Sequence, residues 1–321
     1  MRILVTGASG LLGLNLALEA AKTQADPTYN RHPSFAHPDE HQVFGVVHSH
    51  PLHTSAFTVL QGDLSDPGTA QRILDQTQPD WVINCAALAI VDACETDPVR
   101  AQKMNIELPS QLAALVARGG ARLLHVSTDA VFDGLLGDYS ENDTPNPLSV
   151  YGCSKLEGER AVADANPDAI IARVNFYGWS QSGKRSLSEF FFYNLQAGKQ
   201  ILGFTDVYFC PLLVNDLAYI LLKMLEDGLS GLYHVVSSEC ISKYDFGVAL
   251  AREFGLDESK ITPTSLSEAG LKAARSPRLT LRVDKLSSDI GAQPPGISAG
   301  LNRLNKLYHN NYPQYLRQLG D

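Results

Sequence analysis

The sequence predicts an α/β fold in which a doubly wound parallel sheet carries a smaller, interleaved α/β lobe. Short apolar runs alternate with helical segments along the chain, and they begin at Arg2, Gln42, Phe57, Asp80, Arg122 and Asp168. This alternation indicates parallel strands joined by right-handed crossovers. The length of 321 residues exceeds that of one ordinary core, which favours a second lobe.

The first strand, Arg2 to Thr6, leads into a glycine-rich turn and then into the apolar helix Leu11 to Lys22. The glycines follow a G-x-x-G-x-x-G spacing, which has one more residue in its first gap than the G-x-G-x-x-G fingerprint. Glycines here permit a tight turn, a close approach of backbone N–H groups to a pyrophosphate, and close packing of the helix. A flexible surface loop is the alternative. The predicted dinucleotide contacts are Gly7, Ser9, Gly10, Leu11, Leu12 and Gly13.

The second strand, Gln42 to Val47, is followed by His48-Ser49-His50 and not by a carboxylate. An Asp or Glu at this point usually binds the ribose 2′-hydroxyl of NAD, so the sequence favours NADPH, with NADH as the alternative. Solvated loop histidines are the other interpretation of His48. Residues 23–41 form a polar stretch rich in Pro and His, which we interpret as a surface insertion in preference to a metal site, and we expect no bound metal.

The strand Arg122 to Val126 ends just before Thr128, and the helix expected at 151–163 carries Tyr151 and Lys155 four residues apart. Residues at this spacing share one helix face. A phenol with an ordinary pKa of about 10 becomes a better acid or base beside an ammonium group. A lone Tyr-x-x-x-Lys recurs by chance in helices. Combined with the glycine turn and Thr128, however, it predicts a nicotinamide-dependent oxidoreductase.

The pattern changes after Arg173, where we expect the second lobe to begin. Ser186 to Gln196 and Ile241 to Phe254 have the pattern of helices, the second with Ser242 as its N-cap. The aromatic residues 190–193 can stack on a base, although a core or dimer-interface role is more usual. We assign residues 1–175, with about 210–236, to dinucleotide binding, and about 176–209 and 237–321 to the substrate lobe.

The net charge of −9 argues against nucleic acid as a partner. A diphosphate would still need local cations, and the candidates, each of which can equally be a surface charge, are Lys184, Arg185, Arg275 and Arg278.

The five cysteines have no C-x-x-C spacing, so we expect neither a disulfide framework nor a zinc site, and we expect a packing role for Cys153. No long apolar span or leader is evident, which predicts a cytoplasmic protein without a membrane partner. A homodimer is one option for its assembly.

At this point the chain resembles the extended branch of the short-chain dehydrogenase/reductase superfamily, with its Rossmann fold, and within that branch the dTDP-4-dehydrorhamnose reductases. The stretches that carry the resemblance are Thr6–Gly13, Gly62–Leu64, Val82–Ala87, Val91-Asp92, His125–Gly134, Tyr139–Glu159, Pro211–Ala218 and Ile241–Phe246. They extend over nearly the whole chain.

The resemblance implies reduction of the 4-keto group of a nucleotide-activated 6-deoxy sugar. Tyr151 would protonate the developing alkoxide, Lys155 would hold the nicotinamide ribose and lower the phenol pKa, and Thr128 would bind the substrate oxygen. Further implied cofactor contacts are Asp63, which would meet the adenine, Leu64, Cys85, Ala86 and Ala87. The implied substrate contacts besides Thr128 are Asp129, Ala130, Asn175 and Phe176.

The chain departs from the reductase pattern near the sugar. Ala130 replaces a Tyr, Ala89 replaces a Thr, and Trp179 is displaced from its usual position after Arg173. A dehydratase would have a carboxylate pair after the Thr, whereas here Asp129 is followed by Ala130. A regulatory subunit like the β subunit of methionine adenosyltransferase is the alternative from another class. An epimerase with tightly held NAD is disfavoured by the missing carboxylate after the second strand.

Overall fold

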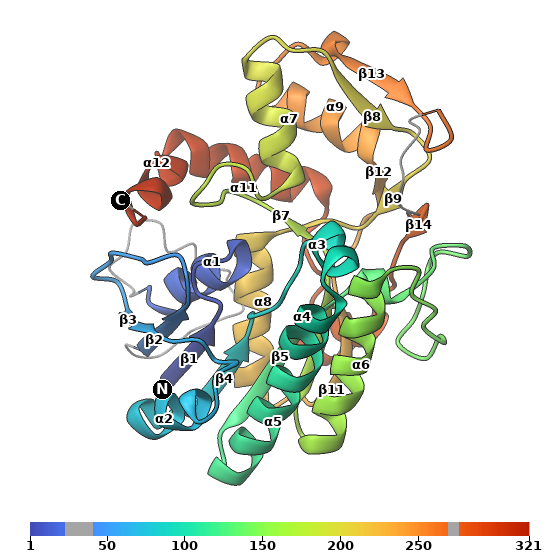
Figure 1. The fold of residues 1–321 in the computed structure, drawn as a ribbon. Helices are drawn as coiled ribbons and strands as arrows, with labels where there is room; N and C mark the ends of the chain where they lie inside the picture. The colour runs from blue at the N-terminus through green and yellow to red at the C-terminus, as the bar shows by residue number, and fades with distance from the viewer. Residues whose placement is uncertain (23–40, 269–275, 321) are drawn as a thin grey trace.

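The computed structural model describes residues 1–22, 41–268 and 276–320 and has the predicted α/β architecture (Figure 1). Its central sheet has seven strands in the order β11-β6-β5-β4-β1-β2-β3, and all neighbouring pairs are parallel. The strands are β1 Arg2–Thr6, β2 Gln42–Val47, β3 Thr58–Gln61, β4 Trp81–Asn84, β5 Arg122–Thr128, β6 Ile170–Val174 and β11 Gly231–Val235. The six expected strands are confirmed to within two residues at their starts, and β11 extends the sheet at one edge.

Successive side chains of a strand point to opposite faces of the sheet, and helices cover both faces. In β1, Ile3 and Val5 belong to one apolar cluster, whereas Leu4 belongs to another. Helices α1 (Leu11–Ala20) and α8 (Val214–Glu226) pack together on the first face. On the second face lie α2 (Thr69–Thr77), α5 (Leu108–Gly119) and α6 (Val150–Ala165). Burial on both sides explains the continuous apolar runs of these strands.

The second lobe lies above the carboxyl ends of the strands in Figure 1. It contains α7 (Leu187–Gln196) and α9 (Lys243–Glu253), the pair β8 (Ile201–Phe204) and β13 (Ile261–Thr264), and a sheet of β12 (Ile241–Ser242), β9 (Tyr208–Phe209) and β14 (Arg278–Leu279). β7 (Phe176–Tyr177) and β10 (Leu212–Leu213) pair where the chain leaves and re-enters the large sheet. The remaining helices are α3 Val91–Thr96, α4 Pro98–Gln102, α10 Asp284–Ile290, α11 Ile297–His309 and α12 Tyr312–Gln318.

The helix signals of this lobe are largely confirmed. The Ser242 hydroxyl caps α9 by accepting from the backbone of Asp245. Ser186 precedes α7 and forms a capping box with Glu189, so the helix begins one residue later than expected. Of the aromatic stripe, Phe191 and Phe192 are buried in the core and Phe190 is exposed. Most of the stripe is therefore structural.

Trp179 is also a core residue. Its side chain is fully buried, and its indole N–H donates to the carbonyl of Leu304, 3.1 Å away. Rings of Phe192, Phe254 and Tyr308 pack around it. The displaced tryptophan therefore lies in the hydrophobic core and not among the residues expected near the sugar.

Two cysteines correct the sequence analysis. Cys210 and Cys240 form a disulfide, whereas we expected no disulfide framework, and Cys85, Cys94 and Cys153 are free. The antiparallel pairing of β9 with β12 sets Phe209 against Ile241, which brings the next pair outward, 210 and 240, face to face. Only the strand register reveals this pairing. Cys153 is exposed, so its expected packing role is also wrong.

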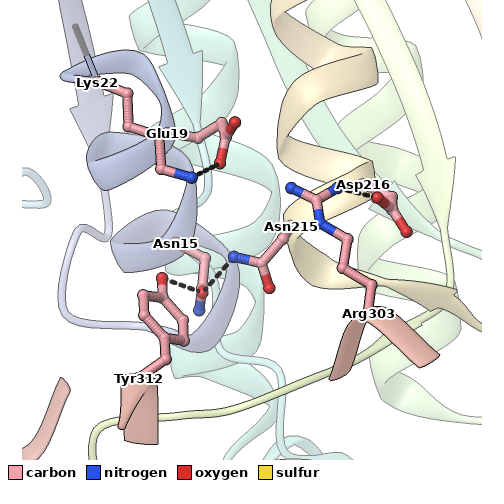
Figure 2. Close-up of polar contacts among 7 residues, drawn as sticks. All are labelled: Asn15, Glu19, Lys22, Asn215, Asp216, Arg303 and Tyr312. Atoms are coloured by element: carbon pink, nitrogen blue, oxygen red, sulfur yellow. Dashed lines mark hydrogen bonds and ion pairs between the residues drawn. The ribbon is translucent and has the colours of Figure 1, made fainter. Parts of the chain in front are cut away.

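A buried polar cluster ties the C-terminal helices to α1 (Figure 2). The carboxamide oxygen of Asn15 accepts hydrogen bonds from the Tyr312 hydroxyl at 2.8 Å and from the amide of Asn215 at 3.3 Å. Arg303 of α11 forms an ion pair with Asp216 of α8 beside it. Three helices far apart in the chain, α1, α8 and α12, thus meet at one asparagine, and α11 joins α8 beside it. Within the described ranges, none of the helices combines the length and the apolar character needed to span a bilayer.

Candidate active site

The candidate site lies where the winding of the sheet reverses. β1, β2 and β3 lead to one edge, whereas β4, β5 and β6 lead to the other. In open α/β sheets such a switch point, here between the ends of β1 and β4, is where a ligand crevice is expected. Gly7 has a positive φ of 65°, and a Cβ added there would lie 2.9 Å from Ala86 N and from Cys85 O. The glycine turn and the end of β4 therefore touch across this crevice. Ala86 N also donates to the Thr6 hydroxyl at 3.2 Å, which links the two strand ends.

The start of α1 can receive an anion. Gly10 is its N-cap and supplies no side-chain hydrogen bond, so the first backbone N–H groups of the helix have no capping acceptor. A Cβ on Gly13 would lie 2.2 Å from the Gly7 carbonyl oxygen, so the helix packs on the turn without room for a side chain. These features fit a dinucleotide pyrophosphate at Ser9 to Leu12.

His48 and Asp63 lie together beyond β2 and β3. Their side chains approach to 3.5 Å between Nε2 and Oδ2. A hydrogen bond from the Ser65 hydroxyl is the main reason that the pKa of Asp63 is lowered, and nearby His48 contributes in the same direction. Leu64, in contrast, is buried in the apolar cluster below the sheet. The edge of the predicted cofactor site is thus formed by His48 and Asp63.

The three predicted catalytic residues converge. Ser149 caps α6, which places Tyr151 in the first turn beside the end of β5. Burial raises the pKa of Tyr151 to about 12, a hydrogen bond with Thr128 lowers it, and the charge of Asp129 raises it. The phenol therefore remains protonated at neutral pH. It can donate a proton to an oxygen held by Thr128.

Lys155 is buried one turn further along α6. Its ammonium donates to the Val126 carbonyl at 2.7 Å and lies 3.4 Å from Nε2 of His125. Burial lowers the pKa of Lys155 to about 8, against the effect of Glu159, so the ammonium is mostly charged at pH 7. Burial is the main reason that the pKa of the Tyr151 phenol is raised, so the expected lowering by Lys155 stays a prediction.

Several buried residues lie near Lys155 and were not predicted as site residues from the sequence. The carboxylate of Glu159 accepts three hydrogen bonds from Arg173, with Nη2 to Oε2 at 2.8 Å, and one from Ser127. His125 hydrogen-bonds Asn84 of the neighbouring strand at 3.0 Å, and burial followed by the charge of Lys155 lowers its pKa well below the ordinary value. Glu159 continues the Tyr151–Lys155 face by another four residues, a signal that could have revealed it.

Asn105 is another residue that the sequence analysis missed. It lies in a single π-helical turn between α4 and α5, a feature common near functional sites. Its amide donates to Ser154 at 2.9 Å and to the Leu88 carbonyl at 3.1 Å, and its oxygen accepts from Leu88 N. Asn105 therefore joins the loop after β4 to the helix that carries Tyr151 and Lys155.

Asp129 and Asn175 lie together beside Thr128. The Asn175 amide donates to one carboxylate oxygen of Asp129, and the Thr128 hydroxyl donates to the other at 3.1 Å. Burial raises the pKa of Asp129 to about 6, against these hydrogen bonds and the charge of Lys243. Ala130 N donates back to Thr128, and Phe176 begins β7 in a half-buried position. These substrate candidates therefore occupy one region.

Other sequence candidates lie elsewhere or have little reactivity. Burial raises the pKa of the Cys85 thiol to about 12, so it is not a nucleophile at neutral pH. Lys184 and Arg185 are exposed before α7, Arg278 lies over the Tyr208 ring at 5.7 Å, and Arg275 falls outside the described residues.

The part of the chain that can be searched holds no cluster of three metal-ligating side chains. The insertion at 23–41 lies outside the described residues except for His41.

Comparison with known proteins shows the family to which the chain belongs. The family model described as RmlD substrate binding domain matches residues 1–309. A probable low-salt glycan biosynthesis reductase, Agl14, of Haloferax volcanii is 33% identical over 96% of this chain and 98% of its own. The dTDP-4-dehydrorhamnose reductase of Mycobacterium tuberculosis is 33% identical over 86% of this chain and 83% of its own. Methionine adenosyltransferase 2 subunit beta of Danio rerio is 31% identical over 89% and 84%.

A solved structure supports the same relationship. The dTDP-4-dehydrorhamnose reductase of Clostridium acetobutylicum superposes with a TM-score of 0.79 at 28% identity. The match covers 96% of this chain and all of that chain. The similarity therefore includes both the large sheet and the second lobe.

Proposed function

The chain belongs to the RmlD substrate binding domain family, and on this premise we propose that it is an oxidoreductase that reduces the 4-keto group of a nucleotide-activated 6-deoxy sugar with NADPH. The observation that carries the proposal is the hydrogen-bonded pair Thr128 and Tyr151, with Lys155 behind it, at the strand ends beside the glycine turn. This arrangement supplies a proton donor and an anion-binding turn at the same end of the sheet.

The residues of the crevice fit the cofactor. The glycine turn and the start of α1 would hold the pyrophosphate, Asp63 the adenosine end, and Lys155 the nicotinamide ribose. The absence of a carboxylate at His48 supports NADPH over NADH. When bound, the cofactor supplies the hydride for the ketone carbon. We assign residues 1–175 and about 210–236 to this role and the remainder to the substrate.

The chain's own residues perform the proton chemistry. Thr128 would position the ketone oxygen, and Tyr151 would donate its proton as negative charge develops there. The charged Lys155 stabilises that negative charge and is held in place by the Val126 carbonyl. Asp129 and Asn175 would bind sugar hydroxyls, with the small Ala130 leaving space beside them. No step needs a metal.

The test is NADPH oxidation followed by absorbance with dTDP-4-dehydro-6-deoxy-mannose generated in situ. We expect turnover by the wild type, loss of turnover in Tyr151→Phe, and normal turnover in Tyr315→Phe, whose ring is exposed on α12. Absence of turnover by a folded, NADPH-binding wild type would overturn the proposed reaction.

A second candidate is supported by the adenosyltransferase relatives. A regulatory subunit of that kind could bind NADP through the same crevice without catalysis. The discriminating measurement is the effect of the purified protein on methionine adenosyltransferase activity, with the Tyr151→Phe variant in parallel. A regulator would act equally well with either residue, whereas the proposed reductase requires the phenol.

The compartment and the assembly are further parts of the proposal. We place the protein in the cytoplasm, as expected for a nucleotide-sugar enzyme, and take a homodimer as the assembly to be tested by light scattering. The Cys210–Cys240 disulfide weighs against the cytoplasm, where thiols are usually kept reduced. Alkylation of free thiols at the moment of cell lysis, followed by mass spectrometry, tests the compartment directly.

A further inference from the structure

Four buried polar side chains connect the glycine turn to the catalytic lysine. Thr6, Asn84 and His125 lie directly opposite one another across the neighbouring strands β1, β4 and β5. Lys155 of α6 approaches the last of them from the helix layer. None of the four is more than 2% exposed, so their hydrogen bonds are made within the protein. Buried polar groups of this kind need partners of matching donor and acceptor character.

The orientation of the Asn84 side chain is fixed by two donors. The Thr6 hydroxyl donates to its carboxamide oxygen at 2.6 Å, and the backbone N–H of Ala86 donates to the same oxygen at 3.2 Å. If the carboxamide were turned around, its NH₂ group would face the Ala86 N–H, which is also a donor. The NH₂ group of Asn84 therefore points away from the glycine turn and toward Nδ1 of His125, 3.0 Å away.

This orientation determines which ring nitrogen of His125 carries the proton. The NH₂ group of Asn84 can only donate, so Nδ1 of His125 must accept and has no proton. Burial and then the charge of Lys155 hold the pKa of His125 well below its ordinary value, so the ring is neutral. A neutral imidazole has one N–H group. In His125 that group is at Nε2.

The Nε2–H group faces the amine of Lys155. The two nitrogens are 3.4 Å apart, whereas the same amine donates to the Val126 carbonyl at 2.7 Å. While the lysine is charged, two donors therefore face each other, and their separation exceeds the usual hydrogen-bond length of about 3.0 Å. A neutral amine has a lone pair that can accept from Nε2–H. His125 consequently interacts better with the neutral amine than with the ammonium group.

The other titratable groups around Lys155 act differently. Glu159 on α6 and Cys85 after β4 raise the pKa of Lys155, against the larger effect of burial. Asp129 and Cys94 act on the phenol of Tyr151. Arg122 lies at the opposite end of β5, where it donates to the Leu225 and Leu229 carbonyls. The remaining charged side chains of α3, α4, α5 and the π-helical turn are exposed, and they are Asp92, Glu95, Arg100, Lys103, Glu107 and Arg118.

We propose that His125 is a positioning residue that favours release of a proton by Lys155, because Asn84 holds the Nε2–H of the ring toward the amine. Through this contact His125 helps to set the highest pH at which the lysine keeps its charge. The consequence for turnover rests on the proposed function, in which that charge stabilises the developing alkoxide. The assignment of the proton to Nε2 does not depend on it.

The first test is the tautomer of His125 in the wild-type full chain. Nitrogen NMR of protein labelled with ¹⁵N-histidine distinguishes a protonated ring nitrogen from an unprotonated one, and the spectrum of His125→Phe identifies the signals that belong to His125. We expect a protonated Nε2 and an unprotonated Nδ1 between pH 6 and pH 9. A proton on Nδ1 in this range would overturn the proposal without the use of any variant that must fold.

The second test is a double-mutant cycle on the titration of Lys155. Lysine labelled with ¹³C at Cε reports the titration by NMR, and Lys155→Met identifies the signal. Asn84→Asp keeps the acceptor for Thr6 and Ala86 but also accepts from Nδ1–H, so the ring should change tautomer and offer Nε2 as an acceptor to the ammonium group. We expect the midpoint of the Lys155 titration to rise by about one pH unit or more.

The cycle separates this effect from the charge of the new carboxylate. When Asn84→Asp is introduced into His125→Phe, the charge remains but the ring nitrogens are absent, so the midpoint should rise by less than about half as much. Equal increases with and without the histidine would overturn the proposal. His234→Phe is the matched control, because His234 is a fully buried histidine of β11, and it should leave the midpoint unchanged. Circular dichroism checks that the variants are folded.

NADPH oxidation shows whether the two proposals stand together. In Asn84→Asp, the alkaline limb of the activity should move to higher pH together with the Lys155 titration. The predicted tautomer and cycle without turnover of any 4-ketosugar would retain the role of His125 and reject the reductase. Turnover by a wild type whose His125 carries its proton on Nδ1 would do the reverse.

Discussion

The ammonium of Lys155 donates to the backbone carbonyl of Val126 over 2.7 Å. This contact fixes the charge at the end of β5, next to the strand residues that precede Thr128. Because the lysine is only 2% exposed, its position is set by the fold and not by solvent.

Lys155→Met should lower kcat by about 100-fold or more, because the positive charge beside the developing alkoxide is lost. In the wild type, activity should fall as the pH rises through about 8, where Lys155 loses its proton. The variant should lack this alkaline limb. Lys306→Met, an exposed lysine of α11, is the control, and an unchanged pH profile in Lys155→Met would contradict the assignment.

Gly13→Ala should abolish NADPH binding and destabilise the fold by about 2 kcal/mol or more, because the new Cβ would lie 2.2 Å from the Gly7 carbonyl oxygen. Fluorescence of bound NADPH and thermal unfolding measure the two effects. Gly119→Ala in α5 is matched, because a Cβ there meets nothing within 4 Å, and it should be neutral or slightly stabilising.

His48→Glu should reverse the cofactor preference. A carboxylate after β2 would accept a hydrogen bond from the ribose 2′-hydroxyl of NADH and repel the 2′-phosphate of NADPH. Dissociation constants for the two cofactors give the readout, with His53→Glu as a control in the same connection. If the ratio of the two constants stays the same in His48→Glu, the histidine does not face the ribose.

Asp129→Asn should stabilise the protein at pH 8 and leave it unchanged at pH 4. Burial raises the folded-state pKa of Asp129 to about 6, so the stability that this group contributes is present at low pH and is lost as the pH rises through 6. A shift of about two pKa units corresponds to about 3 kcal/mol, which the neutral amide would recover. Thermal unfolding at both pH values measures this, and equal shifts at pH 4 and pH 8 would refute it.

Cys240→Ser should lower the free energy of unfolding by about 3 kcal/mol, because the disulfide closes a loop between residues 30 apart. The wild type should lose a similar amount in excess reductant, whereas the variant should be insensitive to it. Denaturant unfolding with and without reductant distinguishes these cases. An insensitive wild type would mean that the two thiols are not bonded in solution.

Features that depend on residues close together in the chain were predictable from the sequence. The strand starts, the N-cap Ser242 and the shared face of Tyr151 and Lys155 depend on neighbouring residues in the chain, and the structure agrees with each. The convergence of Thr128 with Tyr151 followed from the family resemblance together with that local pattern.

Contacts between residues far apart in the chain, which depend on how the strands pair, were not predictable from the sequence. His125 meets Asn84 because the two are opposite each other in the pairing of β4 with β5, and Arg173 reaches Glu159 from a different strand. The Cys210–Cys240 bond depends in the same way on the pairing of β9 with β12. A pattern along the chain does not contain these distances. The net direction of the Tyr151 pKa was not predictable for a related reason, because burial, which the sequence does not report, is its largest cause.

The contact between Asn15 and Tyr312 links residues 297 positions apart in the chain. During synthesis, the helix that begins the cofactor crevice is therefore made early and receives this hydrogen-bond partner only after a further 297 residues have been added. A nascent chain can form the early strands, but α1 lacks its hydrogen bond to Tyr312 until α12 emerges. Truncated products that lack the final helix should consequently be poor NADPH binders, and they would be exposed to proteolysis before they could act.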